Sequence, residues 1–140
     1  MAFWARLLMS SNILAYRLSG GRVGSRMGGQ SVLLLNTTGR RSSKPHTTPT
    51  NYYLDQGRYV IVASNWGSDH HPAWYFNLLH QPAVTIQVKE KVIKVSAIPA
   101  EGDEYDRLWC LVTHSNPFYN RYQQKTRRKI PLIILTPSKQ

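Results

Sequence analysis

The chain has 140 residues, with 18 lysines and arginines against 7 aspartates and glutamates, so its formal net charge at pH 7 is +11. This length is typical of one domain with a sizeable core, and the single cysteine excludes an internal disulfide framework and fits a reducing cytoplasm. The surplus of positive charge predicts a negatively charged partner: a nucleic acid, an anionic membrane surface or a small polyanion.

The first 19 residues predict an amphipathic helix. Large apolar side chains fall on one side of it at helical spacing, namely Trp4, Leu7, Leu8, Leu14 and Leu18. Its apolar stretches are too short to span a bilayer. The helix therefore packs on the main domain, in a dimer interface or over a pocket as a lid, or else it lies on a membrane surface. A Gly-rich basic linker follows, and we place the main domain at residues 31–140, after a helix and linker at 1–30.

A short strand leading into a basic loop is the most informative part of the sequence. Residues 32–35 form an apolar run that fits a buried strand, and Gly39 permits a turn. Three cations and two hydroxyls follow in residues 40–44. Guanidinium groups bind phosphate or carboxylate oxygens in pairs, so the loop is a candidate anion site, although a solvated basic connection has the same composition. A second strand is expected from Pro45 through Tyr53.

Two hairpins and a final strand complete the expected sheet. Residues 47–54 and 58–64 flank Asp55-Gln56-Gly57, and residues 83–88 and 92–97 flank Lys89-Glu90. The last strand covers residues 130–136. About six mainly antiparallel strands with inserted helices predict an α+β fold built on a small antiparallel barrel.

Three helices are expected between these strands. One covers residues 72–80 and starts at Pro72. A second covers residues 101–114 and has an acidic first turn. Cys110 lies within it, where inert packing is the usual role of a cysteine. A third begins near Asn116 and carries two tyrosines.

Three segments can share one cavity: the basic loop, the strand end at residues 63–65, and the start of the helix near Trp74. A planar aromatic ligand with an anionic tail would suit such a cavity. Trp74 and its two aromatic neighbours are equally well explained as core residues. The sequence has no nucleophile–base–acid arrangement and no metal-ligand spacing, so an enzyme of this kind would depend on a cofactor.

Four motifs, in this order along the chain, resemble the deazaflavin-dependent nitroreductase family, which includes F420H2-dependent quinone reductases. They are L-L-L-N-T-T-G-R-R-S-S-K-P-H-T-T-P, V-I-V-A-S-N, H-P-A-W-Y-F-N-L and N-P-F-Y-N-R-Y. The resemblance covers nearly all of residues 32–135. It implies a split β-barrel of the FMN-binding-protein type that binds coenzyme F420, a deazaflavin with a phosphate and oligoglutamate tail. It also implies an oxidoreductase that transfers a hydride from F420H2 to a quinone, an activated enone or a nitroaromatic.

The resemblance assigns roles to residues at matching positions. Arg40, Arg41 and Ser42 would hold the phosphate and tail. The deazaflavin would contact two strands and a helix start, at His46, Thr47, Thr48, Pro49, Thr50, Asn51, Val62, Ala63, Ser64, Asn65, Ala73, Trp74, Tyr75, Phe76 and Asn77. Tyr119, near the ring, and Tyr122, on the acceptor side, are the candidate catalytic residues, although their spacing of three also fits plain amphipathic packing.

The chain departs from the family pattern at several positions. Where members usually have T-G-R-K-S-G, this chain has Arg41 and Ser43, so the second glycine is missing. His46 replaces a common arginine, and Asn65 replaces a lysine of some members. Asn51 and Asn116 replace tyrosines that line the acceptor site in one branch, so the substrate preference of that branch is not expected here.

Three alternatives stay open on sequence grounds. The same barrel can hold FMN or haem, or the chain can be a non-catalytic carrier of F420. A nucleic-acid-binding module using Arg127-Arg128-Lys129 is not favoured, because the aromatics gather at a helix start instead of alternating with cations along strands. The expected partners are a small-molecule acceptor, a homodimer mate and a membrane surface touched by the first helix. The expected location is the cytoplasm, including the inner face of the cell membrane, where quinones are found.

Overall fold

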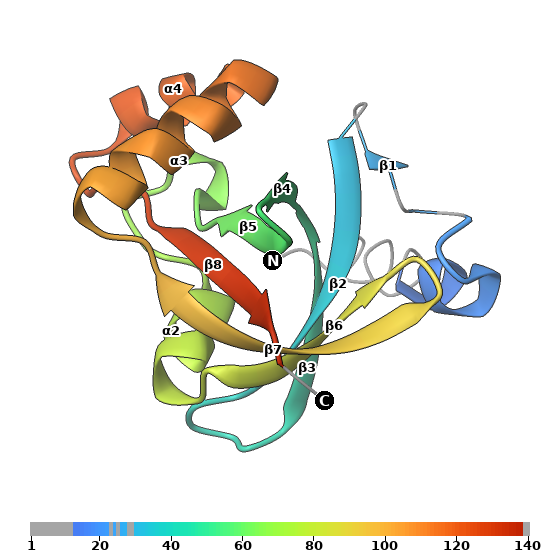
Figure 1. Cartoon of the computed structure of the whole chain (residues 1–140). Coiled ribbons are helices and arrows are strands. Elements are labelled where there is room, and N and C mark those ends of the chain that lie inside the picture. The colour runs from blue at the N-terminus through green and yellow to red at the C-terminus, as the bar shows by residue number, and fades with distance from the viewer. Residues whose placement is uncertain (1–12, 23, 25, 28–29, 139–140) are drawn as a thin grey trace.

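One strongly curled antiparallel sheet forms the centre of the molecule (Figure 1). The structure, a computed structural model, describes residues 13–22, 24, 26–27 and 30–138. The strand order is β1-β2-β6-β7-β8-β5-β4, and β3 pairs with β2. The strands are β1 (Arg26–Met27), β2 (Gln30–Thr38), β3 (Pro45–Asn51), β4 (Tyr53–Asp55), β5 (Arg58–Val62), β6 (Ala83–Val88), β7 (Lys91–Pro99) and β8 (Leu132–Pro137). The predicted antiparallel barrel is confirmed, with eight strands among the described residues in place of the expected six or so.

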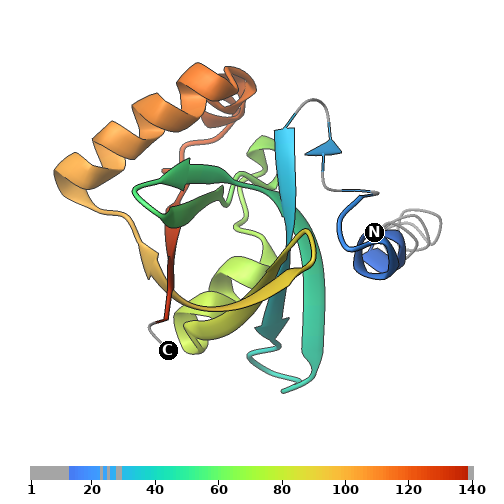
Figure 2. The ribbon, with the colours of Figure 1, turned by 45° about the vertical axis from the view of Figure 1, so that its right-hand side comes forward.

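The helices lie on the outside of this barrel, and the prediction of three of them is confirmed with small shifts in their ends. They are α2 (Ala73–His80), α3 (Gly102–Ser115) and α4 (Phe118–Lys125), with a short 3₁₀ helix, η1 (Asn65–Gly67), before α2. Residues 13–19 are also helical. Figure 2 shows α3 on one side of the barrel and this N-terminal helical segment on the opposite side, outside β2 and β3.

The strand predicted over residues 47–54 is wrong in its extent, because the chain forms two strands there. β3 ends at Asn51 and pairs along its whole length with β2, from Thr38 opposite Pro45 to Val32 opposite Asn51. Only β4 forms the expected hairpin with β5. Its turn residues Gln56 and Gly57 both have positive φ, 53° and 78°, as the tightest hairpin turns require. The turn signal locates the hairpin but carries no information on the length of its strands.

The apolar run in β2 is buried on both faces of the sheet. Leu33 and Leu35 belong to the barrel core, whereas Val32 and Leu34 pack against Tyr16 of the N-terminal segment. The Tyr16 hydroxyl donates to the carbonyl of Val32 at 3.0 Å and accepts from the amide of Lys89 at 2.7 Å. Cover on both faces explains why this strand shows no alternation of apolar and polar residues.

The predicted N-terminal helix is described only in its second half, because residues 1–12 lie outside the described residues. In that half, two of the side chains on the predicted apolar face, Leu14 and Leu18, are 56% and 79% exposed. Tyr16 is the side chain that faces the barrel. None of the helices in the described parts of the chain is long and apolar enough to cross a bilayer.

Helix α3 covers a second core between β5 and β8, and an ion pair network fixes it there. Asp55 accepts hydrogen bonds from Arg107 of α3 at 2.9 Å and from Arg58 of β5 at 2.7 Å. These bonds hold the pKa of Asp55 well below its ordinary value, and the bond from Arg107 makes the largest contribution. The expected packing role of Cys110 is wrong, because its side chain is on the exposed face of α3.

Candidate functional site

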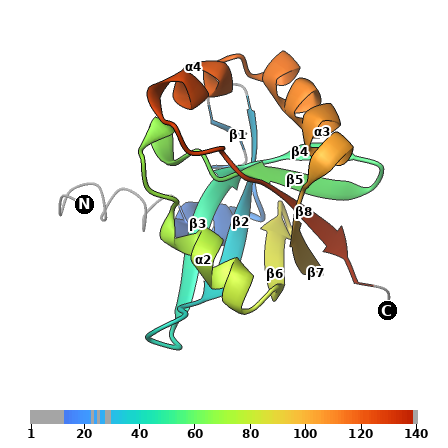
Figure 3. The same ribbon diagram turned by 90° about the vertical axis from the view of Figure 1, so that its left-hand side faces the viewer.

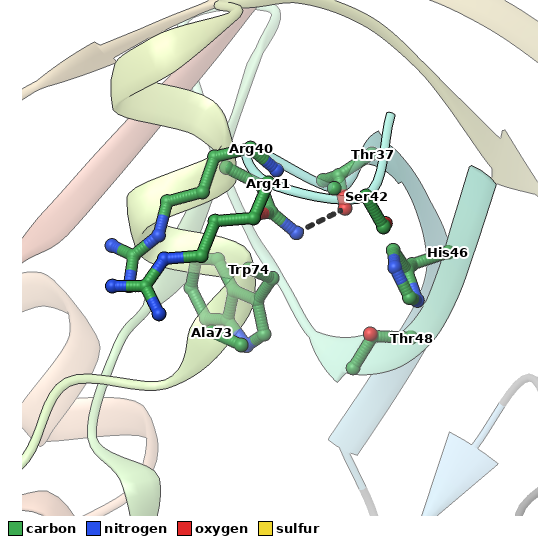
Figure 4. A pocket seen from close by; sticks show the side chains of 10 residues that line it. Thr37, Arg40, Arg41, Ser42, His46, Thr48, Ala73 and Trp74 are labelled. Atoms are coloured by element: carbon green, nitrogen blue, oxygen red, sulfur yellow. Dashed lines mark hydrogen bonds between the residues drawn. The ribbon is translucent and has the colours of Figure 1, made fainter. Parts of the chain in front are cut away.

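The basic loop between β2 and β3 closes a cavity of about 280 Å³ against α2 (Figure 4). The residues that line it are Thr37, Gly39, Arg40, Arg41, Ser42, His46, Thr48, Ala73, Trp74 and Asn77. None of these described lining residues is acidic. The loop and the helix start that the sequence analysis placed together therefore do share one cavity.

Two short backbone bonds hold the loop in a tight turn. The amide of Gly39 donates to the carbonyl of Lys44 at 2.8 Å, and the amide of Ser43 donates to the carbonyl of Gly39 at 2.9 Å. Gly39 is buried, and a Cβ at this position would collide with Ser42 Oγ and lie 2.9 Å from His46 Nε2. A glycine at this position lets the turn close without displacing the side chains of Ser42 and His46.

Ser43 is a serine where the family pattern described above has glycine, and its backbone has a φ of +58°. The left-handed region costs an ordinary residue about 1–2 kcal/mol, and glycine loses about 0.5–1 kcal/mol more entropy on folding. We therefore expect Ser43→Gly to raise the free energy of unfolding by about 0.5–1 kcal/mol, measured by urea titration.

The matched control for this prediction is Ser68→Gly. Ser68 has a φ of −62°, so the exchange relieves no strain there and should lower stability. A stability gain at both positions, or at neither, would contradict the argument from backbone strain.

Asn77 of α2 holds the basic loop in place through a hydrogen bond to its backbone. Its side chain is 7% exposed. Its Oδ1 accepts from the amide of Arg40 at 3.1 Å, and its Nδ2 donates to Thr37 Oγ1 at 3.2 Å. The Arg40 guanidinium lies 4.4 Å from the centre of the Phe76 ring, a cation–π distance. Figure 4 shows the guanidinium groups of Arg40 and Arg41 extending to the same side of the cavity.

The pleat of β3 divides the predicted site residues 46–51 between two faces. His46 and Thr48 line the cavity, and Thr50 shares their face. Thr47 lies on the other face, where it donates to Asn36 Oδ1 at 2.8 Å and accepts from Arg17 at 2.7 Å. By the same alternation, Pro49 and Asn51 face away from the cavity. The structure thus brings only His46 and Thr48 of this block into the lining of the cavity.

The three aromatics at the start of α2 also have different surroundings. Only Trp74 lines the cavity. Tyr75 and Phe76 pack with His71, whose ring centre lies 4.6 Å and 5.6 Å from theirs. Phe76 also carries Arg40 on its face. One aromatic is therefore available as a cavity wall, and the other two pack with His71.

The strand end at residues 62–65 is not part of the lining of this cavity. Val62 and Ala63 are buried, and Ser64 and Asn65 are half-buried. The Asn65 side chain donates to the carbonyl of His70 at 2.9 Å and closes the loop after β5. The carbonyls of Ala63 and Ser64 accept from Arg128, a residue to which the sequence analysis gave no role in this site.

Tyr119 and Tyr122 lie on α4, and neither lines the basic cavity. Tyr119 is 5% exposed, and its hydroxyl oxygen lies 3.3 Å from that of Tyr53, which donates to it. Burial, and then this bond, raise the pKa of Tyr53, while a hydrogen bond from Asn116 opposes the rise. The Tyr122 ring is half-buried and meets Trp66 edge-on with ring centres 6.2 Å apart.

Several residues of these surroundings were not predicted from the sequence. Thr37 could have been found, because it continues the period-two face of Leu33 and Leu35 into the cavity. Tyr53 could not, because its contact with Tyr119 joins residues 66 positions apart. Among the described residues there is no group of three or more histidine, cysteine or acidic side chains that could hold a metal ion.

The curled antiparallel sheet, closed by helices and with a basic cavity at the β2–β3 loop, places the chain among the small split-barrel proteins. Comparison with known proteins is more specific. The family of F420H(2)-dependent quinone reductases matches residues 8–137. An F420H(2)-dependent quinone reductase of Mycobacterium tuberculosis is 42% identical over 125 residues, which cover 86% of this chain and 84% of that protein.

Solved structures agree with this assignment. An F420-H2 dependent reductase, FDR-A, has a TM-score of 0.68 and 38% identity, covering 74% of this chain and 92% of its own. A domain-swapped dimer has a TM-score of 0.73 and 34% identity, covering 94% and 96%. This chain belongs to the F420H2-dependent quinone reductase family. The predicted family, split-barrel fold, oxidoreductase class and coenzyme, reduced F420, are confirmed; FMN as the alternative coenzyme gains no support.

Proposed function

We propose that this chain reduces quinones, and also activated enones or nitroaromatics, with the coenzyme tail bound by Arg40, Arg41 and Ser42. The proposal rests on the composition of the cavity lining. This lining contains two guanidinium groups and several hydroxyl groups, and none of its described residues is a carboxylate. Such donors suit a tail of phosphate and carboxylate groups. The backbone of Arg40 is already held by Asn77, so little ordering is needed when an anion binds.

The ring of the coenzyme would lie beside the tail site, between the Thr48 face of β3, the start of α2 at Trp74 and the strand end at Ser64. Trp74 supplies a flat apolar wall, and the strand end supplies backbone groups. These surfaces would hold the ring in place and leave one face of it open to an acceptor. When bound, reduced F420 supplies a hydride.

Tyr119 is proposed as the proton donor to the acceptor oxygen. A quinone that gains a hydride needs one proton to become a hydroquinone. Tyr119 accepts a hydrogen bond from Tyr53, so the proton of the Tyr119 hydroxyl is left for another acceptor. A hydroxyl held in this way stabilises negative charge as it develops on the acceptor oxygen. Tyr122 would border the acceptor on the exposed side.

A titration of the purified protein with F420 tests the proposal. Binding is followed by the absorption spectrum of F420, and a titration with FMN is run in parallel. We expect tight binding of F420, weak binding of FMN, and oxidation of bound F420H2 when a naphthoquinone is added. A preference for FMN would contradict the coenzyme site. Binding of F420 without reduction of any acceptor class would indicate a carrier in place of an enzyme.

We further propose that the N-terminal segment contacts the inner face of the cell membrane from the cytoplasm, and that residues 1–30 form a membrane-contacting unit that Tyr16 attaches to the barrel of 31–140. Leu14 and Leu18, one turn apart, are largely exposed, which supports this. Leu14→Glu/Leu18→Glu should abolish co-sedimentation with anionic vesicles, and unchanged co-sedimentation would contradict it. If the same variant instead converts a dimer to a monomer, the exposed face serves a homodimer, as the similar domain-swapped structure suggests.

A further inference from the structure

Arg128 is one of three consecutive cations in the sequence, yet its guanidinium points into the molecule. Its Nη2 donates to the carbonyl of Ser64 at 2.7 Å, its Nη1 to that of Ala63 at 3.2 Å, and its Nε to that of Ser68 at 2.7 Å. Nη1 also lies 3.0 Å from Nδ1 of His71. One side chain from the connection between α4 and β8 therefore binds both ends of the loop between β5 and α2, which runs between α4 and α2 in Figure 3.

Two of these contacts fix the orientation of neighbouring peptide planes. The C=O and N–H of one trans peptide point in opposite directions. With the carbonyls of Ala63 and Ser64 turned toward Arg128, the amides of Ser64 and Asn65 face away from it. The loop needs such support, because Asn65 and Trp66 have φ values of +45° and +60°. Non-glycine residues keep this conformation only where their surroundings impose it.

The contacts of Arg128 continue to the basic loop. Burial, and then the charge of Arg128, lower the pKa of His71, so its neutral ring can accept the Arg128 N–H at Nδ1. The His71 ring packs against the Phe76 ring, and the Arg40 guanidinium lies over the face of Phe76. Direct contacts thus join Arg128 to the strand end on one side and to Arg40 on the other.

We propose that Arg128 is a positioning residue of the coenzyme site, which sets the peptide orientation at Ala63 and Ser64 against the deazaflavin ring. The position of the ring rests on the proposed function. Only a planar guanidinium has donors in enough directions to serve both ends of the loop, so lysine should not replace it.

Two probes separate the ring site from the tail site: F420, and an 8-hydroxy-5-deazaflavin that carries only the ribityl chain. Arg128→Gln and Arg128→Lys should each weaken binding of both probes by the same factor, at least about tenfold, which corresponds to about one hydrogen bond lost between the ring and the misplaced strand end. Arg40→Ala/Arg41→Ala should weaken binding of F420 alone, because the shorter probe has no anionic tail.

Thr126→Val is the matched control. Thr126 is 8% exposed and donates to Asp69 at 2.8 Å, so it joins the same connection to the same loop. Its Oγ1 also accepts from the backbone amide of Arg128 at 3.3 Å, but no hydrogen bond joins it to the Arg128 guanidinium or to residues 63 and 64. This variant should lower the thermal midpoint and keep the affinity for the shorter probe. If the Arg128 variants do the same, Arg128 is only structural and the proposal is overturned.

Amide and imidazole NMR signals test the proposal without any coenzyme. In Arg128→Gln, the amide resonances of Ser64 and Asn65 should shift and the pKa of His71 should rise, while Thr126→Val should leave both unchanged. Absence of these changes would overturn the positioning role. If they occur but the wild-type protein binds neither probe, the proposed function fails and the effect of Arg128 on the loop stands.

Discussion

Arg40→Ala/Arg41→Ala is expected to weaken binding of F420 by at least about a hundredfold. Hydrogen bonds to charged groups are worth about 1.5–3 kcal/mol each, and about 1.4 kcal/mol corresponds to a factor of ten. The two arginines are exposed, so salt screens them and the loss should fall toward the lower end of this range. Spectroscopic titration at two salt concentrations measures it, and the wild-type affinity should decrease with salt more steeply than that of the variant.

The control for this prediction removes the same charge elsewhere. Arg121 and Arg127 are both exposed and lie on α4 and the segment after it, outside the basic cavity. Arg121→Ala/Arg127→Ala should keep the affinity within about threefold, because exposed charges beyond a Debye length of about 10 Å contribute little. Equal losses in the two double variants would mean that net charge, and not the loop, attracts the coenzyme.

Tyr119→Phe is expected to lower turnover with a naphthoquinone about a hundredfold, while the affinity for F420 changes by less than about threefold. Loss of one positioned donor to a developing oxyanion costs about 10²–10³ in kcat. The hydroxyl of Tyr119 accepts a hydrogen bond from that of Tyr53, which leaves the proton of Tyr119 for the acceptor. Single-turnover oxidation of bound F420H2 measures the rate directly.

Two further variants test whether the hydroxyl of Tyr119 is the group that matters. Tyr53→Phe keeps that hydroxyl but removes its donor, so turnover should fall less than in Tyr119→Phe. Tyr122→Phe removes the neighbouring phenol, whose ring lies 6.1 Å from that of Tyr119, and should have a smaller effect again. If Tyr119→Phe lowers affinity and turnover equally, Tyr119 has a packing role.

The features of this protein that depend on neighbouring residues were predictable from the sequence. The turn at Gly39, the hairpin at Lys89 and Glu90 and the start of α2 after Pro72 are all present. Each depends on local backbone chemistry within a few residues: a close approach that only glycine allows, a short loop between alternating strands, and a proline that suits a first helical turn. The missing glycine at Ser43 was visible too, but its positive φ was not.

Predictions that depended on strand length or on the faces of a strand were less successful. The Asp55-Gln56-Gly57 turn was located correctly, yet the residues before it divide into β3, which pairs with β2, and β4, which pairs with β5. This division, and not the sequence pattern, sets which of residues 46–51 face the cavity. Residues 46–51 contain no large apolar side chains, so no alternation of apolar and polar residues shows which face of this strand points inward.

The sequence by itself therefore determined the basic loop, the order of most strands and helices, and the family to which the chain belongs. Only the tertiary structure decided that Tyr16 is buried against the sheet, that Tyr53 donates to Tyr119, and that the half-buried Arg128 binds the loop between β5 and α2. The physical reason is that a buried cation or hydroxyl is stable only with partners that replace water. For Arg128 the main partner, the carbonyl of Ser64, is 64 positions away, so within its run of three cations nothing distinguishes it until the chain folds.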